Sequence, residues 1–369
     1  MKNKIQSFIK AQPVLVIAFI LAVISIFIVP PDRQYKEYIN YTVLIQLFAL
    51  MTAVAGLRQA GILDKATHLL LTKVSTVRKL SFIMILICWV SSMFLTNDVA
   101  LITFVPLTLL LFSDIKNENA VILTVIAETT ASNLGSMMTP FGNPQNLYIY
   151  NAFQLNFVDF VSSAVPVGIF GLVLSLLICL FIPKNKCPAP KKQDFTLNTR
   201  NTIVFAVLFL ICIVSVFRIL PVYVCLISAL IAVAVTDIKL LSKVDYALLA
   251  TFVCFFIFVG NLARISIIQN FFRNIMEGHE IIVSILLSQV ISNVPASVML
   301  SGFTEKGKEL MLGVDIGGLG TLIASLASLI SFQFYRKEYP DKSKKYITVF
   351  TLINFIMLFI IGIPADFIW

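Results

Sequence analysis

The sequence predicts an all-α polytopic membrane protein with two inverted repeats, each containing a re-entrant helical hairpin and an interrupted transmembrane helix. Of the 369 residues, 59% are apolar and only 13% are charged. A soluble domain cannot bury that much apolar surface. Apolar runs of about 18 residues or more, the length that crosses the hydrocarbon of a bilayer, recur along the chain. Two further apolar segments break in the middle, and these predict the hairpins.

Nine spans are predicted from the apolar runs. Their ranges are 13–30, 40–57, 119–150 (interrupted), 160–182, 200–218, 220–236, 244–263, 308–335 (interrupted) and 344–363. The first run follows three lysines, Lys2, Lys4 and Lys10, as the core of a signal peptide does. However, it is long for such a core, and no small-residue cleavage site precedes Pro30 and Pro31. We therefore expect an uncleaved first span.

The hairpins are predicted at 80–113 and 279–303. The first segment breaks at Thr96-Asn97-Asp98 and the second at Ser292-Asn293-Val294-Pro295. Each half is expected to have about 15 residues or fewer, too short to cross alone. Each segment should therefore enter and leave on one side. Broken backbone at membrane depth is tolerated where it is buried in protein or lines a wet cavity.

The basic residues predict the orientation. If the N-terminus is cytoplasmic, three quarters of the 28 Lys and Arg residues lie in cytoplasmic loops, as the positive-inside rule requires. The net charge of +9 then reflects loops that face anionic lipid, and no nucleic-acid partner is expected. The expected location is the plasma (inner) membrane, with the C-terminus outside.

Two stretches of the chain resemble each other. The tip 97–100 matches 293–296, 139–147 aligns with 321–329, and the end of the second span, 54–58, has a counterpart at 259–264. The alternative is that these small residues only allow close helix packing.

The predicted division is 1–36 as an N-terminal scaffold span, 37–183 as the first repeat, 184–243 as a basic cytoplasmic loop with scaffold spans, and 244–369 as the second repeat.

Three acids fall at membrane depth, where an unpaired charge costs about 2.5–3.5 kcal/mol or more. Asp98, Glu128 and Asp315 are therefore candidates for proton coupling. The alternatives are a capping role for Asp98 or Asp315, and a helix-to-helix hydrogen bond for Glu128. Broken helices also leave N–H groups that attract anions and C=O groups that suit Na⁺. Arg58 and Arg264 end equivalent spans and serve either to attract an anion or as interfacial anchors.

The motifs at these breaks are similar to those of a known group. The first tip with its following Pro106, the second tip at 292–295, and Gly142-Asn143-Pro144-Gln145-Asn146 resemble the ion transporter superfamily, in particular arsenical-pump membrane permeases and citrate-transporter-like anion permeases. Ala324 and Leu322 depart from the usual Gly and Pro of the second repeat, which puts the second cation site in doubt. The resemblance implies an elevator-type homodimer. It also implies a substrate and ion site formed by Thr96, Asn97, Asp98, Thr139, Gly142, Asn143, Asn146, Ser292, Asn293, Pro295, Thr321, Ser325 and Ser328.

The expected function is secondary active transport of a small inorganic or organic anion, coupled to Na⁺ or H⁺. The alternatives are arsenite or antimonite efflux, which would allow a separate ATPase subunit as partner, and Na⁺/H⁺ antiport. No hydrolase motif and no Cys/His cluster occurs, so we expect no enzyme activity, no metal centre and no cofactor beyond Na⁺ as a coupling ion. The substrate is not determined by these residues.

Overall fold

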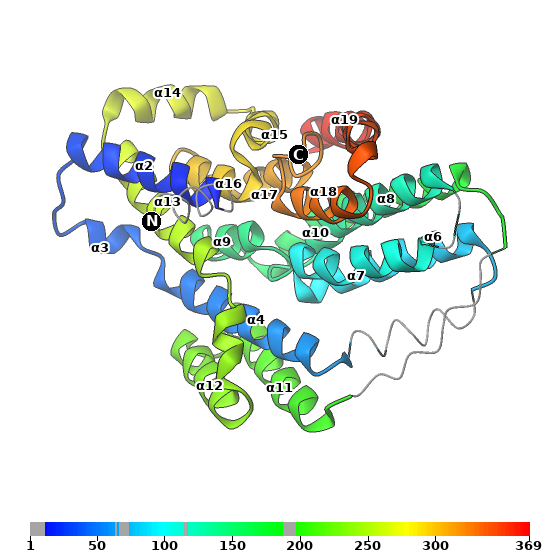
Figure 1. Cartoon of the computed structure of the whole chain (residues 1–369). Coiled ribbons are helices and arrows are strands. Elements are labelled where there is room, and N and C mark those ends of the chain that lie inside the picture. The colour runs from blue at the N-terminus through cyan, green and yellow to red at the C-terminus, as the bar shows by residue number, and fades with distance from the viewer. Residues whose placement is uncertain (1–11, 63–64, 66–73, 114, 116, 187–196) are drawn as a thin grey trace.

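The computed structural model describes residues 12–62, 65, 74–113, 115, 117–186 and 197–369. In this part of the chain every regular element is a helix (Figure 1). The α-helices are α2 (Pro13–Ile28), α3 (Tyr35–Tyr38), α4 (Tyr41–Gln59), α6 (Val77–Leu95), α7 (Asn97–Phe112), α8 (Glu118–Ser136), α9 (Pro144–Ala152), α10 (Phe157–Leu177), α11 (Thr199–Val216), α12 (Val222–Val235), α13 (Tyr246–Ala263), α14 (Ser266–Met276), α15 (Glu280–Ile291), α16 (Asn293–Ser301), α17 (Gly307–Ile316), α18 (Leu326–Glu338) and α19 (Ser343–Ile368). Three short 3₁₀ helices join them, η1 (Ile178–Phe181), η2 (Ile238–Lys243) and η3 (Pro340–Lys342). The N-terminal lysines at 2, 4 and 10 lie outside the described residues.

Within the described residues, six helical segments are long and apolar enough to cross a membrane. They are α4, α6, α10 with η1, α11, α13, and η3 with α19. The prediction of an all-α polytopic membrane protein is therefore confirmed. Two predicted spans are shorter than expected, since α2 has 16 residues and α12 has 14. Pro30 and Pro31 cannot continue α2, and Pro221 precedes the start of α12.

The expected length of the first hairpin arm was wrong. α6 has 19 residues, because Thr76 caps a helix that already begins at Val77 and accepts the Lys79 amide at 3.3 Å. At about 1.5 Å per residue such a helix is about 28 Å long, nearly the thickness of the hydrocarbon.

Both hairpins turn at a single residue with the same backbone conformation. Thr96 between α6 and α7 has φ 69° and ψ 149°, and Ser292 between α15 and α16 has φ 76° and ψ 153°. A positive φ at a residue other than glycine is costly and marks a constrained site. The next residue is an asparagine in each case. Its Oδ1 accepts the following amide, at 3.0 Å for Asn97 and 2.9 Å for Asn293.

The two interrupted helices also break at corresponding places. Residues 137–143 separate α8 from α9, and residues 317–325 separate α17 from α18. In the first break Asn143 caps α9, its Oδ1 accepting the Asn146 amide at 2.8 Å. A Cβ at Gly142 would lie 2.1 Å from the Ser136 carbonyl oxygen, so the chain can approach itself this closely only with glycine here.

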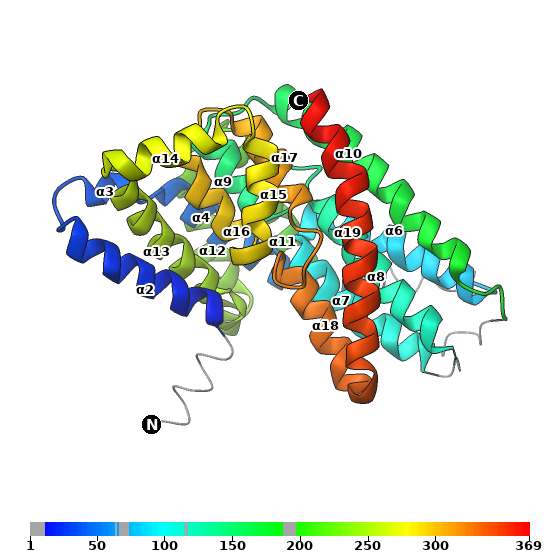
Figure 2. The ribbon, with the colours of Figure 1, turned by 90° about the horizontal axis from the view of Figure 1, so that it is seen from above.

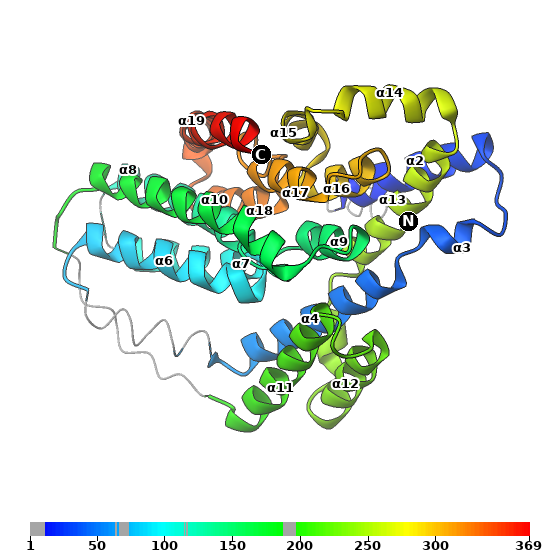
Figure 3. The same ribbon diagram turned by 180° about the vertical axis from the view of Figure 1, so that it is seen from behind.

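The helices form two groups on either side of the broken segments. α2 packs along α13, and α11 and α12 pack on α4, whereas α6, α7, α8 and α10 pack together with α18 and α19 nearby (Figures 2 and 3). α14 has no counterpart among the predicted elements, which placed 264–278 in a loop. It is amphipathic, and two of its apolar residues, Ile267 and Phe271, are exposed. Polar residues interrupt its apolar ones, so the segment does not read as a membrane span in the sequence.

Candidate functional site

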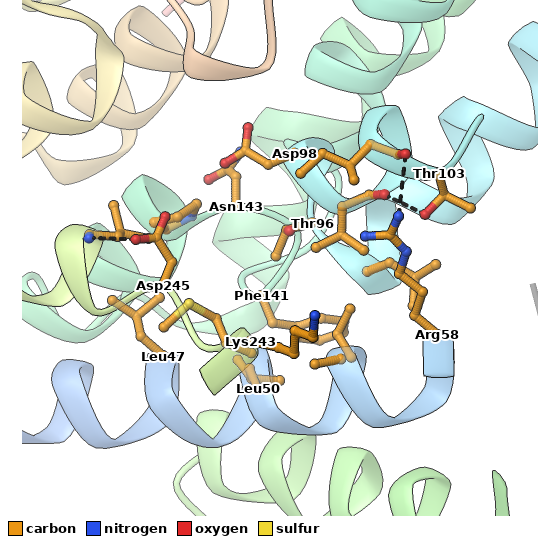
Figure 4. A pocket seen from close by; sticks show the side chains of 18 of the residues that line it. Leu47, Leu50, Arg58, Thr96, Asp98, Thr103, Phe141, Asn143, Lys243 and Asp245 are labelled. Atoms are coloured by element: carbon orange, nitrogen blue, oxygen red, sulfur yellow. Dashed lines mark hydrogen bonds between the residues drawn. The ribbon is translucent and has the colours of Figure 1, made fainter. Parts of the chain in front are cut away.

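A cavity of about 840 Å³ lies between α4, the first hairpin tip, the first helix break and the start of α13 (Figure 4). Thr96, Asp98 and Asn143 of the predicted site line it. Leu47 and Leu50 of α4 and Phe141 of the break form apolar walls. The cavity therefore has polar groups at the broken backbone and an apolar surface on the α4 side, as small-molecule sites commonly do.

Four charged side chains line the same cavity. Arg58 comes from the end of α4, Lys243 from the end of η2, Asp98 from the first turn of α7, and Asp245 from the cap of α13. Asp245 is held in place because its Oδ1 accepts the Leu248 amide at 2.9 Å. Two basic and two acidic groups that converge on one cavity can attract an anion and a cation together.

Arg58 is positioned by a proline. Pro106 lies inside α7 and has no N–H, so the carbonyl of Ile102 loses its helical partner. The Arg58 Nη2 donates to this free carbonyl oxygen at 3.4 Å, as Figure 4 shows. The contact joins α4 to α7 directly beside Thr103, which also lines the cavity.

Two helices begin at the cavity wall. α7 starts at Asn97, next to the lining residue Thr96, and α9 starts at Pro144, next to the lining residue Asn143. The amides at a helix start carry partial positive charge and favour an anion. Both helices are long enough for this effect, with 16 and 9 residues.

Asn133 of α8 joins the first tip to the second broken helix. Its Oδ1 accepts from Asn97 Nδ2 and from Ser325 Oγ, both at 3.1 Å. Its Nδ2 donates to the Gly318 carbonyl oxygen at 3.3 Å. All of these groups are buried. One amide therefore fixes parts of the chain that are far apart in sequence.

Asp315 of α17 makes the reciprocal connection to the first broken helix. Its Oδ1 accepts from Asn143 Nδ2 at 3.0 Å and from Gln145 Nε2 at 3.1 Å. Its Oδ2 is buried without a partner among the described residues. Because Asn143 also lines the cavity, a single side chain separates the buried Asp315 carboxylate from the cavity.

Within each half, a threonine of the helix break contacts the first arm of the hairpin. Thr139 Oγ1 donates to the Met93 carbonyl at 2.6 Å, and Thr321 Oγ1 donates to the Gln289 carbonyl at 3.2 Å. The spacing from Asn133 to Thr139 equals that from Asp315 to Thr321. Corresponding residues of the two aligned stretches thus make corresponding contacts.

Comparison with known proteins identifies the family. The family profile described as "Citrate transporter" matches residues 7–305, most of the chain.

The chain belongs to the citrate transporter family.

The relatives of the chain are named as transporters or as a membrane protein. An uncharacterized transporter of Methanocaldococcus jannaschii, MJ0456, is 31% identical over 307 residues, covering 80% of this chain and 81% of the relative. Inner membrane protein YbiR of Escherichia coli is 30% identical over 314 residues, covering 84% of each. Putative transporter arsB of Dictyostelium discoideum is 31% identical over 158 residues, 42% of this chain and 27% of the relative. The predicted resemblance is confirmed, and the protein is a multi-pass membrane transporter.

The predicted site residues of this citrate transporter family member fall into three places. Three line the cavity: Thr96, Asp98 and Asn143. Four lie around the first tip and break without lining the cavity: Asn97, Thr139, Gly142 and Asn146. Six lie at the second tip and break, outside the cavity lining: Ser292, Asn293, Pro295, Thr321, Ser325 and Ser328. Their roles in binding remain predictions.

Four residues of this region were not among the predicted site residues: Asn133, Gln145, Lys243 and Asp245. The repeat alignment contains the signal for the first, since Asn133 aligns with Asp315 at the spacing of Thr139 and Thr321. Gln145 lies within the motif that carried the family resemblance. Lys243 and Asp245 have no sequence signal, because a charge at the end of a span is the usual interfacial pattern.

Proposed function

We propose that this protein is a secondary active transporter of a small inorganic or organic anion, coupled to Na⁺ or H⁺. The observation that carries the proposal is the cavity at the first hairpin tip. Two helix starts and two basic side chains, Arg58 and Lys243, surround it together with the acids Asp98 and Asp245. An anion would bind the helix starts and basic groups, while a co-transported cation or proton would bind the acids.

Alternating access by an elevator-type motion is part of the proposal. Two stretches with corresponding tips and breaks support inverted repeats, which in transporters carry a site between discontinuous helices. The reciprocal contacts of Asn133 and Asp315 would keep both broken helices together as one moving body. The helices α2, α4, α11, α12 and α13 would be the scaffold. A homodimer and a cytoplasmic N-terminus with an external C-terminus complete the proposal.

The first experiment is ligand-dependent thermal unfolding of the purified protein in Na⁺ or K⁺. Arsenite, sulfate, phosphate, citrate and succinate would each be added. A ligand at a hundred times its dissociation constant stabilises the folded state by about 2.7 kcal/mol. A shift by one anion that requires Na⁺ would identify both substrate and coupling ion. A shift by Na⁺ alone would favour Na⁺/H⁺ antiport, and a shift by arsenite would favour the efflux alternative, to which the relative named arsB draws attention.

The variant Asp98→Asn tests the proposed role of the tip acid. It removes the only charge at either tip and should abolish coupled uptake of the identified anion into proteoliposomes while the protein stays folded. Asp159→Asn is the matched control, because Asp159 pairs with Lys308 at 3.4 Å and is absent from the cavity lining. Transport by Asp98→Asn at the wild-type rate would contradict the role of Asp98.

A further inference from the structure

Glu128 is a buried carboxylate outside the cavity. It lies in the middle of α8, is fully buried, and accepts a hydrogen bond from the Thr108 hydroxyl of α7. Its Oε2 has no partner, and no ion pair of the described residues includes it. A permanent charge without a partner at this depth is costly, so such a group usually exchanges a proton.

Two tyrosine hydroxyls on α18 and α19 are also buried, with no hydrogen-bond partner among the residues that the structure describes. Tyr346 of α19 and Tyr335 of α18 are both fully buried, and their rings stack with centroids 4.6 Å apart. Buried hydroxyls are nearly always hydrogen-bonded, so each exception needs an explanation. α18 reaches the same part of α8, because the Oγ1 of Thr129, the residue after Glu128, donates to Ser331 Oγ at 2.8 Å, and Ser331 lies one turn before Tyr335. Cys88 of α6 is a further buried titratable group on a helix packed against α8.

The line of polar groups continues to the protein surface. Glu118, in the first turn of α8, is 29% exposed and pairs with Lys345 at 3.0 Å and Lys342 at 3.3 Å. Lys345 directly precedes Tyr346, so its ion pair with Glu118 holds the start of α19 against the start of α8. Ten residues of α8 separate Glu118 from Glu128, about 15 Å along the helix axis. The stacked pair Tyr346 and Tyr335 thus lies next to the Glu118 ion pairs at one end and next to the Glu128 turn of α8 at the other.

We propose that Glu128 is a proton-binding site, and that Glu118, Tyr335 and Tyr346 form its path to the surface, separate from the anion cavity. A proton from a surface water enters at Glu118. Each tyrosine oxygen then accepts one proton and releases its own to the next group, directly or through a water, until Oε2 of Glu128 is protonated. No electron is transferred, and each tyrosine ends in the form in which it began.

Thr108 connects this site to the cavity. It lies on α7, the helix that carries Asp98, Thr103 and Pro106 into the cavity wall. The ionised Glu128 carboxylate only accepts hydrogen bonds, whereas the protonated form also donates one. Protonation of Oε2 removes the negative charge of the carboxyl, so the bond from Thr108 to Oε1, one of the contacts between α7 and α8, is weakened. This part of the inference rests on the proposed function, because it makes Glu128 the coupling site for protons.

The test is infrared difference spectroscopy of the full chain in lipid during a pH titration, which needs no substrate and no transport. The wild type should show a protonated-carboxyl band that titrates, and the band should be absent in Glu128→Gln but present in Asp98→Asn. Thr108→Val keeps the carboxyl and should move the titration midpoint of the band. If Glu128→Gln fails to fold, the shift of the midpoint in Thr108→Val still assigns the band to Glu128.

The path is tested by the rate at which the band forms after a pH jump. Tyr346→Phe and Tyr335→Phe should leave the band in place but slow its formation about tenfold, as expected for loss of one hydrogen-bonding group from the path. Tyr223→Phe is the control, because Tyr223 is an exposed tyrosine of α12, a helix that packs on α4 and α11. If no band depends on Glu128, the proton site is wrong. If the band forms equally fast in all three variants, the path is wrong. Either result leaves the anion-transport proposal intact.

Discussion

The amide of Asn133 is predicted to be a main stabilising contact between the two broken helices. The variant Asn133→Ala removes four hydrogen bonds, those with Asn97, Ser325 and the Gly318 carbonyl and a longer one to Ser328 at 3.5 Å. A typical hydrogen bond contributes about 1 kcal/mol, and a buried group left without its partner costs at least as much. We therefore expect the variant to lose about 3 kcal/mol of unfolding free energy.

Reversible unfolding in mixed micelles of a mild detergent and dodecyl sulfate measures this free energy. Asn156→Ala is the matched control, because Asn156 is an exposed cap that accepts the Val158 amide at 2.7 Å, and loss of a cap costs about 1 kcal/mol. Equal losses in the two variants would refute the reasoning, since burial and the number of partners would then have no effect.

A double-mutant cycle separates this network from a general loss of packing. Ser325→Ala removes one of the donors to Asn133. If the two side chains interact, the double variant Asn133→Ala with Ser325→Ala should be less destabilised than the sum of the two single variants. Additive losses would mean that the contact at 3.1 Å contributes nothing measurable.

Two further predictions concern a helix break and the surface charge. Gly142→Ala places a methyl group 2.1 Å from the Ser136 carbonyl oxygen and should cost about 1–3 kcal/mol of unfolding free energy in the same assay. The control Gly362→Ala, whose nearest atom is a flexible side-chain end at 3.1 Å, should be neutral or slightly stabilising. Equal effects of the two variants would refute the steric argument. The hydrogen bond from Lys345 lowers the pKa of Glu118 below its usual value. Its stabilising contribution is therefore full above the pKa of the unfolded chain and is lost as the pH falls through the folded value. A series of unfolding measurements at acid pH should show a shallower loss for Glu118→Gln than for the wild type, and parallel curves would contradict this assignment.

Much of the fold follows from the sequence alone. Apolar length determines the spans, because a bilayer accepts only runs that cross it. The breaks at Thr96 and Ser292 fall where the sequence predicted them. The side chains of Asn97 and Asn293 accept the amide of the next residue, which a continuous helix would pair with a carbonyl four residues earlier. Helix ends were less predictable, as the cap at Thr76 that lengthens α6 shows.

For the candidate site, too, some residues could be predicted from the sequence and others could not. The residues at the tips and breaks could be named from the sequence, since polar and small residues within apolar runs are unusual. The cavity could not be located, because Arg58, Lys243 and Asp245 reach it from helix ends where a charge is ordinary. Only the tertiary structure brings α4 and the start of α13 against the first tip and lets Arg58 bind the carbonyl that Pro106 frees. The sequence by itself determined where the helices break, because that depends on local backbone chemistry. Which broken segments share a cavity was decided by the packing of elements far apart in the chain.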